Sequence, residues 1–237
     1  KPGYEENKAS FWALMDADVG STPIMVENPA DRSRKTFVFK RGAWITPGAE
    51  VHAGVPKSLA YAMPANAPKN RVGLAMWLTD KRNPLLSRTM ANRVWEQLFG
   101  TGIVETLEDM GTQGMNPTHK ELLDHLSWQL MNDYKWSVKR LIKEMVMSAT
   151  YRQDSKVTED TKKKDQFNKY YARGPRMRLS AEQIRDQHLS VSGVLSAKMY
   201  GPGVMPWQPN GIWNSPYNGA TWNNSQGEDQ FRRAIYT

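Results

Sequence analysis

The sequence predicts a mainly helical fold that carries a small antiparallel β hairpin and ends in a long irregular segment rich in Gly, Pro and Trp. Apolar residues recur at helical spacing between residues 70 and 199, whereas periodicity disappears from residue 200 onward. β-Branched and aromatic residues flank a short turn near residue 30. We therefore expect an N-terminal arm at 1–69, a helical core at 70–199 and an irregular aromatic-rich segment at 200–237.

The expected hairpin joins residues 24–27 to residues 36–40 through an Asn-Pro-Ala-Asp turn. Residues 41–69 contain many Gly and Pro residues and are expected to be extended. Because two strands alone are only marginally stable in water, this arm must pack against something else.

The helical region begins with a strong local signal at Asn83-Pro84. Asn is favoured at the N-cap and Pro in the first helical turn, so a helix is expected to run to about Phe99 and to end at Gly100. The cleanest amphipathic helix lies further along the chain. Its apolar residues are Val138, Leu141, Ile142, Met145, Val146 and Ala149.

Capping boxes predict two further helix starts, at Thr118 with Glu121 and at Ser180 with Gln183. In this motif each side chain accepts a hydrogen bond from the other residue's backbone N–H. The helix after Ser180 carries an apolar stripe that includes His188, so we expect His188 to be a buried core histidine. The stripe is formed by Ile184, Val191 and Leu195.

The net charge of +8 suggests an acidic partner, which would be a nucleic acid, an anionic glycan or a membrane surface. The alternative is a solvated basic surface, because the excess charge is spread along the chain. No nucleic-acid-binding signature is present, so nucleic acid is an unlikely partner. The absence of Cys excludes disulfides, cysteine-zinc sites and covalent haem attachment in this segment. No apolar run is long enough for a transmembrane helix.

Three sets of residues are candidates for a site, and each has a structural alternative. Glu105 and Asp109, with Glu108, lie in a Gly-rich loop, where carboxylates serve acid/base chemistry on a sugar or bind calcium. The alternative is that Arg88 and Arg93 pair with these acids and fix the loop. We predict no metal site from ligand spacing and leave catalysis open.

The second set is a dense polar cluster around one helix start, which includes Arg178, Glu182 and Asp186. It is interpreted either as an internal ion-pair network or as an anion-binding site. Its remaining members are Arg176, Arg185 and Gln187.

The third set is aromatic: Trp207, Trp213, Tyr217 and Trp222 on a Gly- and Pro-rich frame with Asn and Gln between them. Such a segment suits a sugar-stacking platform, because the rings meet C–H faces and the amides meet hydroxyls. It would equally serve as a docking surface for a further C-terminal region.

Several ordered segments carry a family resemblance. Three of them are Asn83 to Gln153, Arg176 to Gln187 and Trp207 to Trp213, and shorter ones lie upstream between Thr36 and Leu78. Together they resemble a domain family of unknown function. It forms the C-terminal part of large exported proteins that are named for the cytochrome c-like domains many of them carry, and it is abundant in planctomycetes and related bacteria.

The resemblance implies a module of an exported, cytochrome c-linked protein that contributes a substrate-binding or scaffolding surface in the periplasm or at the cell surface. The alternative is a glycan-binding or glycan-modifying domain that uses the Trp-rich segment. Any haem would lie elsewhere in the parent protein, and the partners would be its remaining domains and an anionic glycan. We expect the chain, which opens with Lys1, to be an internal part of that longer protein.

Overall fold

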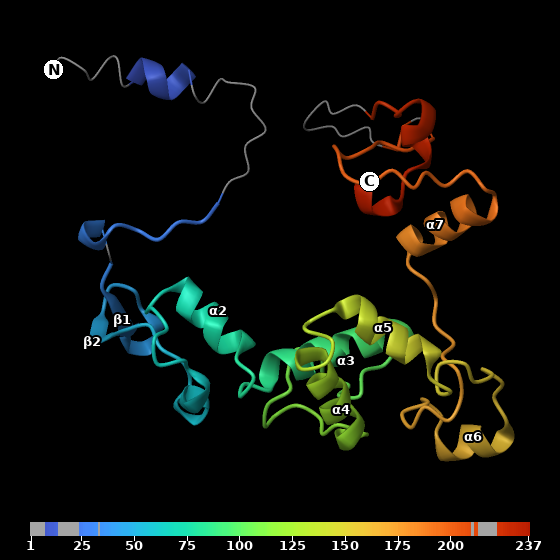
Figure 1. Ribbon diagram of the computed structural model, residues 1–237, viewed down its shortest axis with the longest axis horizontal. Helices are drawn as coiled ribbons and strands as arrows, with labels where there is room; N and C mark the ends of the chain where they lie inside the picture. Colours follow the sequence, from blue (N-terminus) through green and yellow to red (C-terminus); the bar gives the residue numbers. More distant parts are fainter. Residues whose placement is uncertain (1–7, 14–23, 33, 210, 213–221) are drawn as a thin grey trace. The chain divides into compact units, whose positions relative to one another are not determined.

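The computed structural model describes the chain except residues 1–7, 14–23, 33, 210 and 213–221 (Figure 1). The chain divides into two compact units, Lys1–Leu86 and Ser87–Thr237. The described residues are mainly helical and contain one two-stranded antiparallel sheet, so the predicted fold class is confirmed at that level. None of the described helices is long and apolar enough to cross a membrane.

The sheet of the first unit pairs β1 (Thr36–Phe39) with β2 (Pro47–Val51). Its register aligns Thr36 with Val51 and shifts by one residue between Phe37 and Phe39. The prediction that residues 24–27 form the partner strand is therefore wrong. Those residues have no regular structure, and the carbonyl of Val26 accepts a hydrogen bond from Arg71 Nη2 at 2.8 Å.

Helix α2 (Arg71–Thr79) carries Trp77, the largest buried hydrophobic residue among the described residues of the first unit. Asn70 caps it, because its Oδ1 accepts hydrogen bonds from the backbone N–H groups of Val72 and Gly73. Trp77 is 6% exposed and donates from Nε1 to the carbonyl of Leu59. The short 3-10 helices of this unit are η1 (Ala30–Arg32), η2 (Lys40–Gly42) and η3 (Lys57–Ala62).

Helix α3 (Leu85–Phe99) begins and ends where the sequence predicts. Asn83 Oδ1 accepts a hydrogen bond from the backbone N–H of Leu85, and its Nδ2 donates to the carbonyl of Trp77. Gly100 follows the helix with a φ of 79°, a left-handed conformation that glycine adopts at little cost.

The core of the second unit forms around α3, α4 (Lys120–Met131) and α5 (Val138–Met147). Trp95 and Phe99 stack with ring centroids 3.9 Å apart, and Tyr171 meets both rings edge-on. The predicted amphipathic helix is confirmed as α5. Its buried side chains are Leu141 and Met145, and those of α4 are Leu123, Leu126, Ser127 and Leu130.

The capping box predicted at Thr118 is wrong. Helix α4 follows His119, which makes no side-chain capping bond. Thr118 is engaged elsewhere, because both its backbone N–H and its hydroxyl donate to the carbonyl of Ile103. The Thr118 hydroxyl therefore closes the Gly-rich loop after α3 instead of starting a helix.

The capping box at Ser180 is confirmed. Ser180 and Gln183 each accept the other's backbone N–H at the start of α7 (Ala181–Val191). The prediction that His188 lies on a buried apolar stripe is wrong, however, since His188 is exposed and Val191 is 84% exposed. The half-buried face carries Ile184, Arg185, Asp186 and Leu189 instead. That face differs because α7 packs against the C-terminal η5 (Ala234–Tyr236), where Asp186 accepts a hydrogen bond from the backbone N–H of Ala234.

A buried arginine organises the described part of the C-terminal segment. Arg232 is 1% exposed, donates to the carbonyls of Pro202 and Tyr200, and lies 3.7 Å from the centre of the Tyr236 ring. Further helical elements are α6 (Glu159–Lys164) and η4 (Gly227–Phe231), and residues 8–13 are also helical. Residues 210 and 213–221 lie outside the described residues, so a long irregular segment stays a prediction.

Candidate functional site

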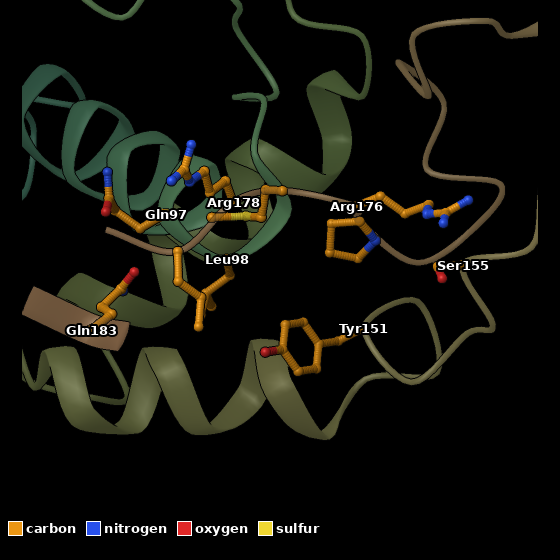
Figure 2. Close-up of a pocket in the computed structure, with 10 residues that line it drawn as sticks. Gln97, Leu98, Tyr151, Ser155, Arg176, Arg178 and Gln183 are labelled. Carbon is orange, nitrogen blue, oxygen red and sulfur yellow. The ribbon is translucent and has the colours of Figure 1, made fainter. Parts of the chain in front are cut away.

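A groove borders residues 175–179 in the second unit (Figure 2). Its volume is about 740 Å³. The last turn of α3, the residues after α5 and the first turn of α7 complete its walls. The polar lining residues are Gln97, Tyr151, Ser155, Arg176, Arg178 and Gln183, and the apolar ones are Leu98, Pro175, Met177 and Leu179.

The segment 175–179 has no regular structure, but both of its ends are held in place. Upstream, buried Arg173 donates to the carbonyls of Asp165 and Gln166, and the backbone N–H of Gly174 donates to the carbonyl of Asp154. A side chain at position 174 would not fit, since a Cβ there would lie 2.5 Å from the carbonyl of Gln153. Downstream, the capping box of α7 begins at Ser180.

The middle of this segment lies close to the end of α3. A Cβ built on Gly100 would stand 3.5 Å from the sulfur of Met177, so Met177 packs directly over the glycine that ends the helix. Tyr151 is also fixed, because its ring meets Phe99 edge-on at 5.6 Å between centroids. The groove is therefore built on the aromatic core rather than on an unsupported loop.

Both charged lining residues of the groove are arginines. Within the described residues, neither Arg176 nor Arg178 makes a hydrogen bond or an ion pair, and both are exposed. Side chains two residues apart in extended chain lie roughly 6.6 Å apart along it. Glu96, which precedes Gln97, accepts a hydrogen bond from Gln97 Nε2 at 2.7 Å and is not among the lining residues. The lining is therefore positive and has no internal acid of its own.

A second, smaller hollow of about 330 Å³ borders the same segment. It shares Pro175, Arg176 and Met177 with the first and also touches Phe99 and Phe167. Arg176 therefore borders both hollows, and a ligand in either one would lie near its guanidinium.

Tyr171 lies in the core close to this region and stays neutral over a wide pH range. It is 5% exposed, and burial raises its pKa to about 12. Its hydroxyl donates to the carbonyl of Thr101, and the ring of His119 lies 5.4 Å away. These contacts close the loop after α3 and give Tyr171 a structural role.

The carboxylates predicted from the Gly-rich loop do not form a shared site with the arginines of α3. Glu105 pairs with Lys169 at 2.6 Å, and Asp109 Oδ1 accepts the backbone N–H of Gly111. The interpretation that Arg88 pairs with these acids is wrong, because Arg88 pairs with Asp124 on α4. Among the described residues, no group of His, Asp and Glu is arranged to hold a metal ion.

The polar cluster of Arg178, Glu182 and Asp186 divides among three roles. Arg178 lines the groove, whereas Asp186 accepts the backbone N–H of Ala234 at 2.7 Å. Glu182 lies at the start of α7, where hydrogen bonds from the backbone N–H of Glu182 and from the Ser180 side chain lower the pKa of its carboxyl group. Sequence reasoning missed Gln97, Leu98 and Ser155, because only tertiary folding brings them to Arg178.

The aromatic set is described only in part. Trp207 is 69% exposed, and Trp222 donates from Nε1 to the carbonyl of Pro206 at 2.8 Å. Trp213 and Tyr217 lie outside the described residues, so the sugar-stacking platform stays a prediction.

Fold and groove thus define a mainly helical domain with a basic surface groove. Residues 70–237 match the family described as "Protein of unknown function (DUF1553)", also called PSD1, and the chain belongs to this family. The groove lies inside the matched region, whereas β1 and β2 lie before it. No protein of curated function and no solved structure matches the chain.

Proposed function

We propose that this domain is a binding module and that its groove holds an acidic glycan chain. The observation that carries the proposal is that Arg176 and Arg178 both line the groove and that neither has a hydrogen-bonding or ion-pair partner among the described residues. Their guanidinium groups point in opposite directions in Figure 2, so each would contact a different part of an extended chain.

The chemistry of the lining favours an anion of planar or tetrahedral shape. Guanidinium groups bind carboxylate and sulfate oxygens through paired hydrogen bonds, which an ammonium group cannot match. Each hydrogen bond to a charged group contributes about 1.5–3 kcal/mol. The volume of about 740 Å³ also falls in the usual range for ligand sites.

The neutral part of the lining favours a sugar over a small inorganic anion. The side chains of Gln97, Ser155 and Gln183 offer hydrogen bonds to hydroxyl groups. The ring of Tyr151 and the side chain of Leu98 offer apolar surface to the C–H face of a pyranose. A free sulfate or phosphate could accept hydrogen bonds from these hydroxyl and amide groups but would leave the apolar surface of Tyr151 and Leu98 unused.

The test is a binding isotherm of the 237-residue chain against alginate, dextran sulfate and neutral dextran. We expect binding to at least one of the two acidic chains and none to neutral dextran. Arg176→Ala with Arg178→Ala should weaken that binding at least tenfold, because a tenfold change needs only about 1.4 kcal/mol.

The matched control removes two other exposed cations from the same unit, Lys162→Ala with Lys163→Ala on α6. This pair lowers the net charge by the same amount away from the groove. Equal losses in both double variants would show that overall charge drives binding and would refute the groove as the site. Loss of binding in Trp207→Ala alone would favour the Trp-rich segment instead.

We also propose, from the resemblance of the sequence segments, that the domain serves as a module of an exported cytochrome c-linked protein in the periplasm or at the cell surface. The intact mass and the reduced and oxidised absorption spectra of the parent protein from its native source test this setting. Absence of haem from the parent polypeptide would contradict the proposed link to a cytochrome c-type protein and would leave the glycan-binding proposal unchanged.

A further inference from the structure

The connection between β1 and β2 is a compact turn that carries two exposed apolar side chains at its outer end. The backbone N–H of Lys40 donates to the carbonyl of Thr46, and the Thr46 hydroxyl donates to the carbonyl of Ala43. These bonds fix residues 40–46. Within the turn, Trp44 is 79% exposed and Ile45 is 69% exposed.

The strands behind this turn are also unusually uncovered. Val38 is 57% exposed and Phe39 is 47% exposed. Among the described elements, the main packing partner of each strand is the other strand (Figure 1). The β1–β2 ribbon, residues 36–51, therefore buries little of its own apolar surface. Single exposed hydrophobic side chains are common on proteins, but here several lie close together in the sequence.

Basic residues surround the apolar turn. Residues 31–51 contain five basic and two acidic residues, which leaves a net charge of +3. Lys35 pairs with Glu50 at 3.3 Å, whereas Lys40 and Arg41, next to the turn, have no ion pair among the described residues. Arg41 also holds a left-handed φ of 51°, which contributes to the sharp bend of the chain there.

We propose that this turn is a membrane-docking tip: Trp44 and Ile45 insert into the interfacial layer of an anionic lipid surface, and Lys40 and Arg41 contact its headgroups. Trp suits this layer because its ring is apolar and its N–H still finds a polar partner. The adjacent unpaired cations match an acidic lipid surface, which attracts each nearby Lys or Arg.

The test is co-sedimentation of the 237-residue chain with phosphatidylcholine vesicles that contain or lack phosphatidylglycerol. We expect the chain to sediment with the phosphatidylglycerol vesicles and only weakly with phosphatidylcholine alone. Trp44→Ala with Ile45→Ala should reduce the partition coefficient by on the order of tenfold. Lys40→Ala with Arg41→Ala should also reduce it by on the order of tenfold, and added salt should mimic this loss.

Matched controls distinguish vesicle binding by the tip from nonspecific hydrophobic or electrostatic adsorption. Trp207→Ala removes a Trp of similar exposure, and Lys162→Ala with Lys163→Ala removes two cations, so both should sediment like the wild type. Failure of the wild type to sediment would overturn the proposal, as would equal sedimentation of the two tip variants and the wild type. Self-association that disappears in Trp44→Ala with Ile45→Ala, without vesicle binding, would assign the tip to contact between copies instead.

Discussion

Two regions of this chain use their aromatic side chains in opposite ways. In the helical core of the second unit, Trp95 and Phe99 stack on each other and are 3% and 5% exposed. In the ribbon of the first unit, Phe39 and Trp44 are 47% and 79% exposed. The first pair stabilises the fold, whereas the second contributes little to it. Aromatic content alone therefore does not locate a core, because the same residue types also occupy exposed surface.

The largest expected effect comes from a core truncation compared with a ribbon truncation. Leu123→Ala removes a side chain that is fully buried on α4, and we expect it to lower the free energy of unfolding by about 2–5 kcal/mol. Val38→Ala on β1 should stay within about 0.5 kcal/mol of the wild type. Urea unfolding followed by far-UV circular dichroism measures both. Similar losses in the two variants would mean that the ribbon is packed like the core.

A second test uses pH, because the core holds a buried titratable group. Burial raises the pKa of Tyr171 from 10.0 to about 12, so between these values the unfolded chain loses this proton first. The unfolded state then binds fewer protons, and the free energy of unfolding falls as pH rises, by up to about 2.7 kcal/mol. The comparison of wild type with Tyr171→Phe isolates this group. A Tyr171→Phe variant that keeps the same pH slope would exclude Tyr171 as its source.

The smallest expected effect concerns a local cap outside the core. Ser180→Ala removes the hydroxyl that accepts the backbone N–H of Gln183, and we expect a loss of about 1 kcal/mol. The reciprocal bond, in which Gln183 accepts the N–H of Ser180, weakens with it. Thermal unfolding measures the change, and Ser190→Ala on the exposed side of the same helix is the control. Because Ala favours a helix interior more than Ser does, Ser190→Ala should not destabilise the chain, and equal losses in both variants would contradict the cap as the source of the effect.

The sequence predicted the features that depend on neighbouring residues. Asn83 and Gly100 bound α3 as expected, and Ser180 with Gln183 starts α7, because capping involves groups within a few residues of one another. The strand pairing was predicted incorrectly, since residues 24–27 and 47–51 compete for the same partner and local pattern does not decide between them.

Long-range contacts also explain the other differences. Thr118 has the right spacing for a capping box, but its hydroxyl donates a hydrogen bond to the carbonyl of Ile103. His188 was expected to be buried, but α7 turns its half-buried face toward Arg233 and Ala234. The groove was not predicted, and Arg176 and Arg178 were singled out only as members of a polar cluster, because the walls at Gln97 and Ser155 come from distant parts of the chain.

Hydrogen exchange of the 237-residue chain, with and without the acidic glycan that it binds, tests directly whether the groove is the binding site. The backbone of residues 175–179 makes no regular structure, so its amides should exchange quickly in the free chain. We predict that the ligand protects the peptide spanning residues 174–180 and the one around Tyr151 to Ser155, and leaves residues 40–46 unchanged. Protection confined to residues 200–209, or to the ribbon, would contradict the assignment of the groove as the binding site.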